Sequence, residues 1–151
     1  MVTGIVFRAN SALRLLVPTL LKFERSSTTM ATSPLDQLTD VDIDIGVYKY
    51  ILIKVHHETN GKEMHKYIVR GCSSAEYHGD IYDQVAPAIE SKKMDCECVG
   101  GGRIRHEPDK KSILVYGYSQ GYGKADHGIT VELLKKKYSD YASITYSNDG
   151  Y

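Results

Sequence analysis

A histidine, a glycine-interleaved loop and a run of three glycines are the parts of this 151-residue sequence that could carry out chemistry. His78 directly precedes a segment in which apolar residues recur every fourth position, the pattern of an amphipathic helix. The positive end of a helix dipole disfavours a charged imidazole, so we expect His78 to be neutral and basic near neutral pH. His78 is therefore a candidate general base, and the alternative is a helix cap or a surface residue.

The second feature is the loop at residues 116–124, which reads YGYSQGYGK and joins a predicted strand to a predicted helix. Its glycines allow successive backbone N–H groups to point at one anion. It is not a Walker A loop, because Tyr118 stands where the first glycine is needed and Ala125 replaces Ser or Thr. It also fails the dinucleotide fingerprint, since Asp126 occupies the place of the third glycine. The loop is either another kind of anion site or an ordinary turn.

The third feature is the run of glycines at residues 100–102, which Arg103 follows. Consecutive glycines cost backbone entropy, so the fold must need unusual dihedral angles or a close approach there. Arg103 is a candidate phosphate partner, as are Lys49 and Arg70 in two other predicted strands. The alternative is that these cations are solvated or cap a strand end.

Composition limits the possible partners. Nineteen basic residues balance nineteen acidic ones, which argues against duplex DNA or an anionic membrane as a partner of the whole chain. No apolar run approaches the ~18–20 residues that a membrane helix needs. The three cysteines, Cys72, Cys96 and Cys98, are odd in number and lack zinc-site spacing. We therefore expect reduced thiols, a reducing compartment and no metal site.

Residues 1–38 differ from the rest of the chain. They are leucine-rich, carry arginines, have few acidic residues and include a Ser/Thr-rich tract at residues 26–33, which is typical of a mitochondrial transit peptide. The alternative is an extension upstream of a second start at Met30. We assign residues 1–38 to an extension outside the fold and residues 39–151 to the domain. The expected location is cytoplasmic, or mitochondrial if residues 1–29 act as a leader.

The domain must supply the elements that position the three features. Strand patterns cover residues 47–55, 66–70, 95–99, 112–118 and 143–146, and residues 56–63 are predicted as a loop. Helical patterns follow His78 as far as Ile89 and cover residues 125–138. The order β-β-α-β-β-α-β predicts a single α/β domain whose helices cover a sheet.

These segments together resemble the protein phosphohistidine phosphatase family, also called janus/ocnus. The resemblance rests on five motifs in the same order and covers about residues 41–151. They are VRG at 69–71, EYHGDI at 76–81, CEC followed by GGGRI at 96–104, the loop segment at 115–123, and NDGY at 148–151.

The resemblance implies a mixed β-sheet flanked by helices and an active site without metal or cofactor. Its one essential histidine falls on His78 and its substrate-binding lysine on Lys49. The implied reaction is hydrolysis of the P–N bond of phosphohistidine, so the partners are histidine-phosphorylated proteins or peptides and phosphate. The chain is expected to be a monomer that binds no nucleic acid. The implied phosphate-binding loop and its supporting cations are Ser119, Gln120, Gly121, Arg70 and Arg103.

Two questions stay open at the level of sequence. His78 can act as a general base on water or as a nucleophile that is itself phosphorylated. The alternative function is a phosphoprotein-binding developmental regulator of the janus/ocnus type with little turnover. Loss of the histidine or of the loop would favour that alternative, and both are present. A nucleotide-binding enzyme is disfavoured by the two failed motifs.

Overall fold

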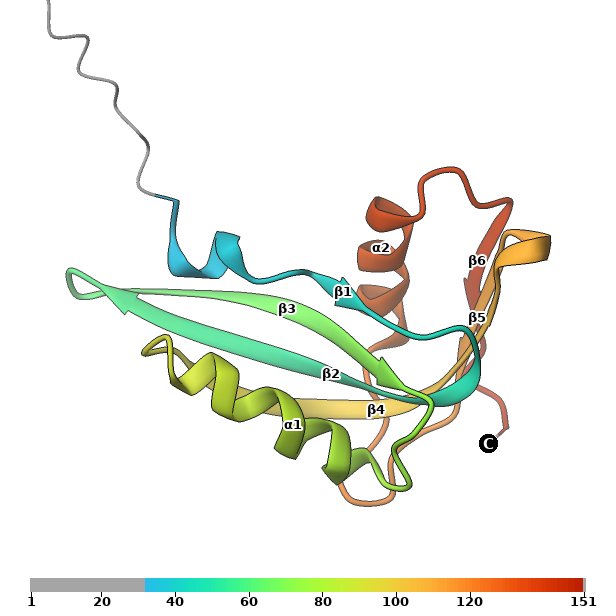
Figure 1. The fold of residues 1–151 in the computed structure, drawn as a ribbon, viewed down its shortest axis with the longest axis horizontal. Coiled ribbons are helices and arrows are strands. Elements are labelled where there is room, and N and C mark those ends of the chain that lie inside the picture. Colours follow the sequence, from blue (N-terminus) through green and yellow to red (C-terminus); the bar gives the residue numbers. More distant parts are fainter. Residues whose placement is uncertain (1–31, 151) are drawn as a thin grey trace, which may run out of the picture. The chain divides into compact units, whose positions relative to one another are not determined.

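The computed structural model describes residues 32–150. The predicted leader, the second start at Met30 and the terminal Tyr151 lie outside the described residues. In the described part, six strands form one sheet in the order β1-β3-β2-β4-β5-β6, with helices on both faces (Figure 1). The strands are β1 (Val41–Asp42), β2 (Gly46–Thr59), β3 (Lys62–Cys72), β4 (Asp95–Glu107), β5 (Ser112–Tyr116) and β6 (Ser143–Tyr146). The helices are α1 (His78–Glu90) and α2 (His127–Lys137), with short 3-10 turns η1 (Pro34–Gln37) and η2 (Pro108–Lys110).

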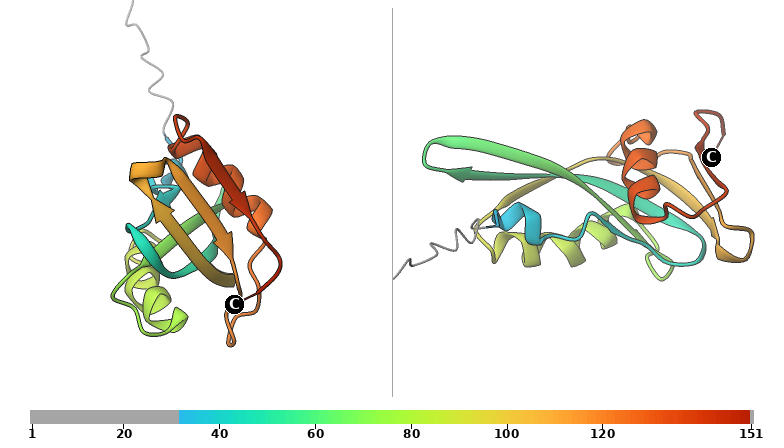
Figure 2. Two further views of the ribbon diagram at one scale, coloured as in Figure 1. Left: turned by 90° about the vertical axis from the view of Figure 1, so that its right-hand side faces the viewer. Right: turned by 90° about the horizontal axis from the view of Figure 1, so that it is seen from above.

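The sheet is mixed. The pairs β1–β3 and β5–β6 are parallel, and the pairs β2–β3, β2–β4 and β4–β5 are antiparallel. Figure 2 shows that the sheet twists strongly from β2 to β6. The predicted α/β class with a mixed sheet and flanking helices is confirmed. The predicted order describes β2 to β6 with α1 and α2, and the structure adds the two-residue strand β1 in front of them.

Residues 56–63, predicted as a loop, instead complete a long hairpin. β2 continues to Thr59 and β3 begins at Lys62, so only Asn60 and Gly61 form the turn. Their φ angles of 53° and 74° are the positive values that a two-residue Asn-Gly hairpin turn requires. The Asn-Gly pair was the signal in the sequence, and the polar side chains around it hid the strand pattern.

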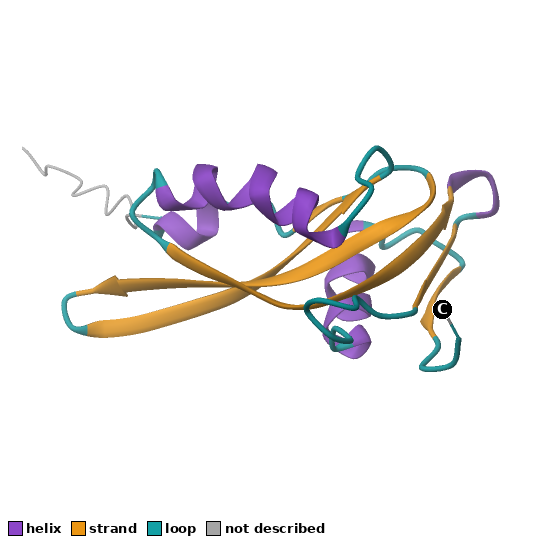
Figure 3. Ribbon diagram, turned by 90° about the horizontal axis from the view of Figure 1, so that it is seen from below, coloured by secondary structure: helices purple, strands orange, loops and turns teal. Residues whose placement is uncertain are grey.

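The two faces of β2 enter two separate cores, because successive strand residues point to opposite sides. Tyr48, Tyr50 and Leu52 pack with Leu134 of α2. Ile51, Ile53 and Val55 lie on the other face and pack with residues of α1. Burial on both faces explains why β2 reads as an almost continuous apolar run. Figure 3 shows α1 and α2 on opposite sides of the sheet.

The fold includes residues that the sequence prediction placed in the extension. Residues 34–37 form η1, which Ser33 caps by accepting a hydrogen bond from the N–H of Leu35. Leu35 is only 3% exposed and belongs to the core beneath α1. The folded domain therefore begins before residue 39. No described helix is long and apolar enough to cross a membrane.

Candidate active site

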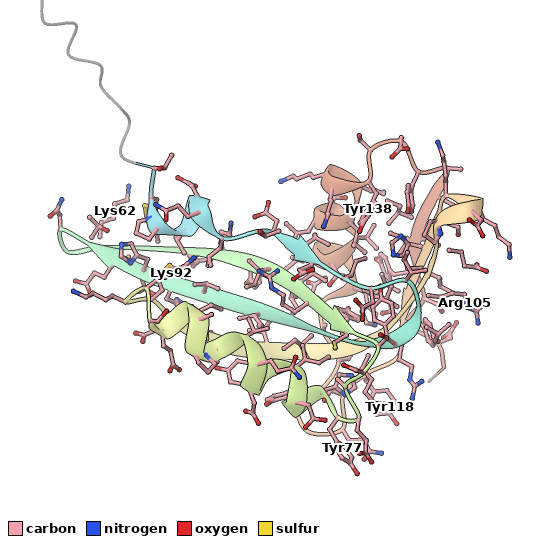
Figure 4. The ribbon with its side chains drawn as sticks, in the orientation of Figure 1. Lys62, Tyr77, Lys92, Arg105, Tyr118 and Tyr138 are labelled. Carbon is pink, nitrogen blue, oxygen red and sulfur yellow. The ribbon has the colours of Figure 1, made fainter. Side chains whose placement is uncertain are left out.

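A cleft of about 650 Å³ opens where the first turn of α1 meets the loop that joins β5 to α2. It brings together residues from three distant parts of the chain, including the predicted histidine, lysine and loop. Figure 4 shows Tyr77 beside the first turn of α1, with Tyr118 of the loop on the same side of the molecule. The cleft is lined by Lys49, Glu76, Tyr77, His78, Gly79, Ser119, Gln120, Gly121 and Tyr122.

His78 is the first residue of α1 and is 7% exposed. Its Nε2 lies 2.9 Å from the carbonyl oxygen of Gly102 in β4. A carbonyl oxygen can only accept a hydrogen bond, so Nε2 carries the proton and donates it. In the neutral ring the lone pair is then on Nδ1, which makes no hydrogen bond within the described residues. The structure thus leaves Nδ1 as the atom that can accept a proton or attack phosphorus.

The surroundings of His78 favour its neutral form. Burial lowers the pKa of His78, and the charges of Lys49 and Arg103 lower it further. The hydrogen bond to Gly102 acts in the opposite direction, because it favours the protonated ring. The direction agrees with the expectation from the sequence, although burial is the largest cause. His78 can therefore act as a base at neutral pH.

The loop is closed by hydrogen bonds between its own ends. The N–H of Ser119 donates to the carbonyl of Gly123 at 3.1 Å, and the N–H of Gly123 donates back at 2.9 Å. The hydroxyl of Ser119 accepts from the N–H of Tyr122 at 3.2 Å. The amides of Gln120 and Gly121 make no hydrogen bond within the described part of the chain. The groups left to bind an anion are these two amides and the Ser119 hydroxyl proton, whereas the Ser119 amide is already used.

The three glycines of β4 allow the histidine and the loop to lie against the strand. A Cβ on Gly101 would be 2.7 Å from Cδ2 of His78 and 3.1 Å from Cβ of Ser119. The backbone of Gly101 also binds the loop, since its N–H donates to Gly123 and its carbonyl accepts from Ala125, each at 3.0 Å. The predicted close approach at the glycine run is confirmed.

The two cations nearest His78 lie side by side. Lys49 of β2 pairs with Arg103 of β4, so their side chains leave the same face of the sheet. Lys49 lines the cleft and has no carboxylate within ion-pair distance among the described residues. Arg103 is not among the residues that line the cleft, but its charge acts on His78. Together they make this side of the cleft attractive to a phosphate.

Arg70 is not brought to the cleft. Its guanidinium donates to the carbonyl of Val69 at 2.8 Å and to that of Thr39 at 2.7 Å. Burial lowers the pKa of Arg70, while Asp42 and Asp40 oppose that shift. The position of Arg70 ties the segment before β1 to β3, which is a structural role.

Comparison with known proteins identifies the family of this chain. The model of the Janus/Ocnus family matches residues 35–142. The chain belongs to the Janus/Ocnus family. The 14 kDa phosphohistidine phosphatase of Sus scrofa is 52% identical over 126 residues, covering 80% of this chain and 98% of that protein. That of Homo sapiens is 50% identical, covering 81% and 100%. The sex-regulated protein janus-A of Drosophila pseudoobscura pseudoobscura is 45% identical, covering 81% and 83%.

One residue of this Janus/Ocnus chain was not recognised in the sequence. His127, 2% exposed, donates from Nε2 to the carbonyl of Gly117 at 2.9 Å. Its Nδ1 accepts from the hydroxyl of Tyr50 at 2.6 Å. His127 therefore anchors the start of the loop to the core. Its position directly after Asp126, which caps α2, was the one available signal.

Within residues 32–150, no group of three or more His, Cys, Asp or Glu side chains could hold a metal ion. The three cysteines are free thiols. Burial raises the pKa of Cys98 to about 11, so that thiol is protonated at neutral pH.

Proposed function

We propose that this chain is a protein phosphohistidine phosphatase that hydrolyses the P–N bond without a metal ion. The observation that carries the proposal is the position of His78, whose Nδ1 is a neutral acceptor in a cleft lined by Lys49 and by two unbonded loop amides. The names of the relatives in Sus scrofa and Homo sapiens support the same activity.

Binding of the phosphoryl group would use the donors of the cleft. The amides of Gln120 and Gly121 and the hydroxyl of Ser119 would hold the phosphoryl oxygens from one side. The ammonium of Lys49 would contribute a point charge from the sheet. The loop donors are held by the two hydrogen bonds between Ser119 and Gly123, so they would stabilise charge as it moves in the transition state.

In the chemical step, Nδ1 of His78 would take a proton from a water molecule as the water oxygen attacks phosphorus. The new P–O bond forms while the P–N bond breaks, and the departing imidazole nitrogen takes a proton from solvent. Holding water and phosphorus in line supplies much of the acceleration. The hydrogen bond from Nε2 to Gly102 places the lone pair on Nδ1 before the step, and it still holds the ring once Nδ1 has accepted the proton.

The same atom could instead attack phosphorus directly and become phosphorylated. The two routes differ in whether phosphate is ever bound to the enzyme. Rapid quenching of the reaction with labelled substrate separates them. Label trapped on His78 supports the nucleophile, and its absence at early times supports the base.

The proposal is tested by the release of inorganic phosphate from a phosphohistidine peptide by the full chain. His78→Ala should lower turnover by ~10²-fold or more, the usual effect of removing a positioned base. His65→Ala is the matched control, because His65 is exposed near the far turn of the hairpin and should retain the rate. Near-normal turnover by His78→Ala would place the active site elsewhere.

Two further results bear on the proposal. Dialysis against a strong chelator should leave the rate unchanged, and recovery of a lost rate by zinc or magnesium would contradict metal-free hydrolysis. The similarity to a protein named janus-A is compatible with the alternative function, a phosphoprotein-binding regulator with little turnover. A wild-type chain that binds a stable phosphohistidine analogue but releases no phosphate would be a phosphoprotein-binding regulator.

A further inference from the structure

The sheet face next to the cleft is left uncovered by α1. In Figure 1, α1 runs beneath β2 and β4 and its first turn stops before the end of the sheet that β5 and β6 form. His78 lies at this first turn. A polypeptide whose phosphohistidine entered the cleft would therefore pass over the uncovered end of the sheet.

Two rows of side chains cross this uncovered face. Nearest the cleft, Lys49, Arg103 and Tyr116 are successive partners across β2, β4 and β5. The next row consists of Val47, Arg105 and Leu114. Both rows point away from the core that contains Tyr48 and Ile104, because side chains alternate along a strand.

The second row, which we call the outer row, combines exposed apolar and cationic groups. Val47 is 53% exposed, although it lies in a strand and next to buried Tyr48. Arg105 beside it is exposed, and Leu114 is half-buried. The outer row can therefore offer a peptide one apolar contact next to one positive charge.

The charge of this face is not balanced nearby. Among the described residues, Arg105 has no carboxylate within ion-pair distance, and the same holds for Lys49. Glu107, two residues beyond Arg105, is bound to Lys110 at 2.9 Å. Glu76, which lines the cleft, is not in an ion pair with Lys49 or Arg105.

We propose that the outer row binds the substrate polypeptide on one side of its phosphohistidine and selects a carboxylate there. This inference rests on the proposed function and adds a substrate preference to it. The two rows are two residues apart along each strand, which is roughly 7 Å. An extended peptide advances about 3.3 Å per residue, so the favoured Asp or Glu lies about two or three residues from the phosphohistidine.

The test uses peptides that carry a phosphonate analogue of phosphohistidine, which the enzyme cannot hydrolyse. Glutamate is moved one position at a time along each side of the analogue, and dissociation constants are measured with the full chain. Affinity should peak about two or three residues away on one side. Glutamate there should bind about 2- to 5-fold more tightly than lysine, the range of an exposed ion pair. High salt should remove the difference.

Variants assign the preference to the outer row. Arg105→Ala should abolish the preference for glutamate, and Arg105→Glu should reverse it towards lysine. Lys92→Ala is the matched control, since Lys92 is an exposed cation just beyond the other end of α1, and it should keep the preference (Figure 4). Thermal melting checks that each variant is folded.

Several outcomes would overturn the inference. These are equal binding of the glutamate and lysine peptides, a preference that Arg105→Ala leaves intact, or self-association of the chain that Arg105→Glu abolishes. The last would assign the face to a second copy of the chain. The proposed function is judged separately, by turnover of free phosphohistidine, which has no flanking residues. Absence of phosphate release from the phosphohistidine peptide as well would reject the phosphatase, while the binding ratios still decide the docking face.

Discussion

At His78, the hydrogen bond to Gly102 decides which nitrogen is available for chemistry. The donor and the acceptor are 24 residues apart, and they meet because Gly101 has no side chain to separate α1 from β4. A sequence pattern can place a histidine before a helix, but it cannot show which ring nitrogen is already used. That information comes from the strand on which the ring lies.

The pH dependence of the reaction should reflect the lowered pKa of His78. A protonated Nδ1 cannot accept a proton, so activity is lost as the pH falls through the pKa of the free enzyme. Because burial and the two nearby cations lower that pKa, the acid limb of kcat/KM should lie below the ordinary histidine value of about 6.5. A profile of kcat/KM against pH measures it. An acid limb above that value would contradict a base in this environment.

Lys49 should contribute to binding more than to the chemical step. Its ammonium offers a point charge to the phosphoryl group before and during the reaction. Lys49→Ala should therefore raise KM by roughly 10- to 150-fold, equivalent to ~1.5–3 kcal/mol, with a smaller change in kcat. Steady-state kinetics measure both constants. Lys62→Ala, in the exposed turn end of the hairpin, is the control. An unchanged KM would remove Lys49 from the site.

The sequence predicted the site residues unevenly. His78 and the loop stood out by their positions in the sequence, the resemblance to the family assigned Lys49, and all of them line one cleft. Arg70 was proposed on the same grounds, but its guanidinium is bonded to two backbone carbonyls. A cation in a strand looks the same in a sequence whether it meets a ligand or the backbone. Only the neighbouring strand distinguishes the two cases.

At the scale of elements, β4 brings the site together, because both His78 and the loop lie against this strand. Its glycine run lets α1 contribute His78 from one face and lets the loop bind to the backbone of Gly101. On the other face, a Cβ on Gly102 would be 2.9 Å from Cε1 of His127. Side chains on this strand would push both histidines away. The entropy cost of the three glycines is thus linked to the positions of the His78 and His127 rings.

Replacing Gly101 with a larger residue should move His78 away from β4. In Gly101→Ala the new Cβ would lie 2.8 Å from the carbonyl oxygen of Tyr50, which is backbone and cannot turn aside. We expect a loss of ~1–3 kcal/mol in stability and a lower kcat as His78 shifts. Denaturant unfolding and kinetics measure these effects.

Gly121→Ala is the matched control for that change. A Cβ at this loop glycine would meet nothing within 4 Å, and its φ is not in the left-handed region. Stability should stay the same or rise by ~0.4–1 kcal/mol, because the unfolded chain loses freedom. If Gly101→Ala behaved like Gly121→Ala, close packing on β4 would not be what positions the histidine.

Most elements followed from local pattern, and the exceptions have physical causes. β2, α1, α2 and β6 have apolar residues at strand or helix spacing, so their approximate positions could be predicted. The end of the hairpin was missed because both of its faces are polar there. β1 has only two residues, too few for any periodicity, and it exists because β3 offers a free edge.

For the whole molecule, two cores lie on opposite faces of one sheet, and the site forms where α1 begins. The core under α1 stops near His78, and the core under α2 supports the loop through His127. The site is thus supported by both cores but covered by neither. Stability and activity should therefore respond to changes far from the cleft, including changes at the N-terminal end of the domain.

The N-terminal end of the domain contributes a buried side chain to one of the two cores. Leu35 of η1 fills the core beneath α1, and the backbone after η1 is bound to β3, since Lys66 donates to the carbonyl of Leu38 at 2.7 Å and Arg70 to that of Thr39. A chain beginning at Met30 keeps these contacts and should melt within a few degrees of the full chain. A chain beginning at Thr39 loses Leu35 and should be destabilised by ~2–5 kcal/mol, or roughly 10 °C.

Thermal melting of the two shortened chains and of full-length Leu35→Ala measures the contribution of η1. Leu35→Ala should reproduce most of the loss seen on starting at Thr39, because both remove the same buried side chain. Equal melting temperatures for the chains starting at Met30 and Thr39 would show that η1 adds nothing to the core. A large loss already at Met30 would mean that the preceding segment packs on the domain, and would contradict its assignment as an extension.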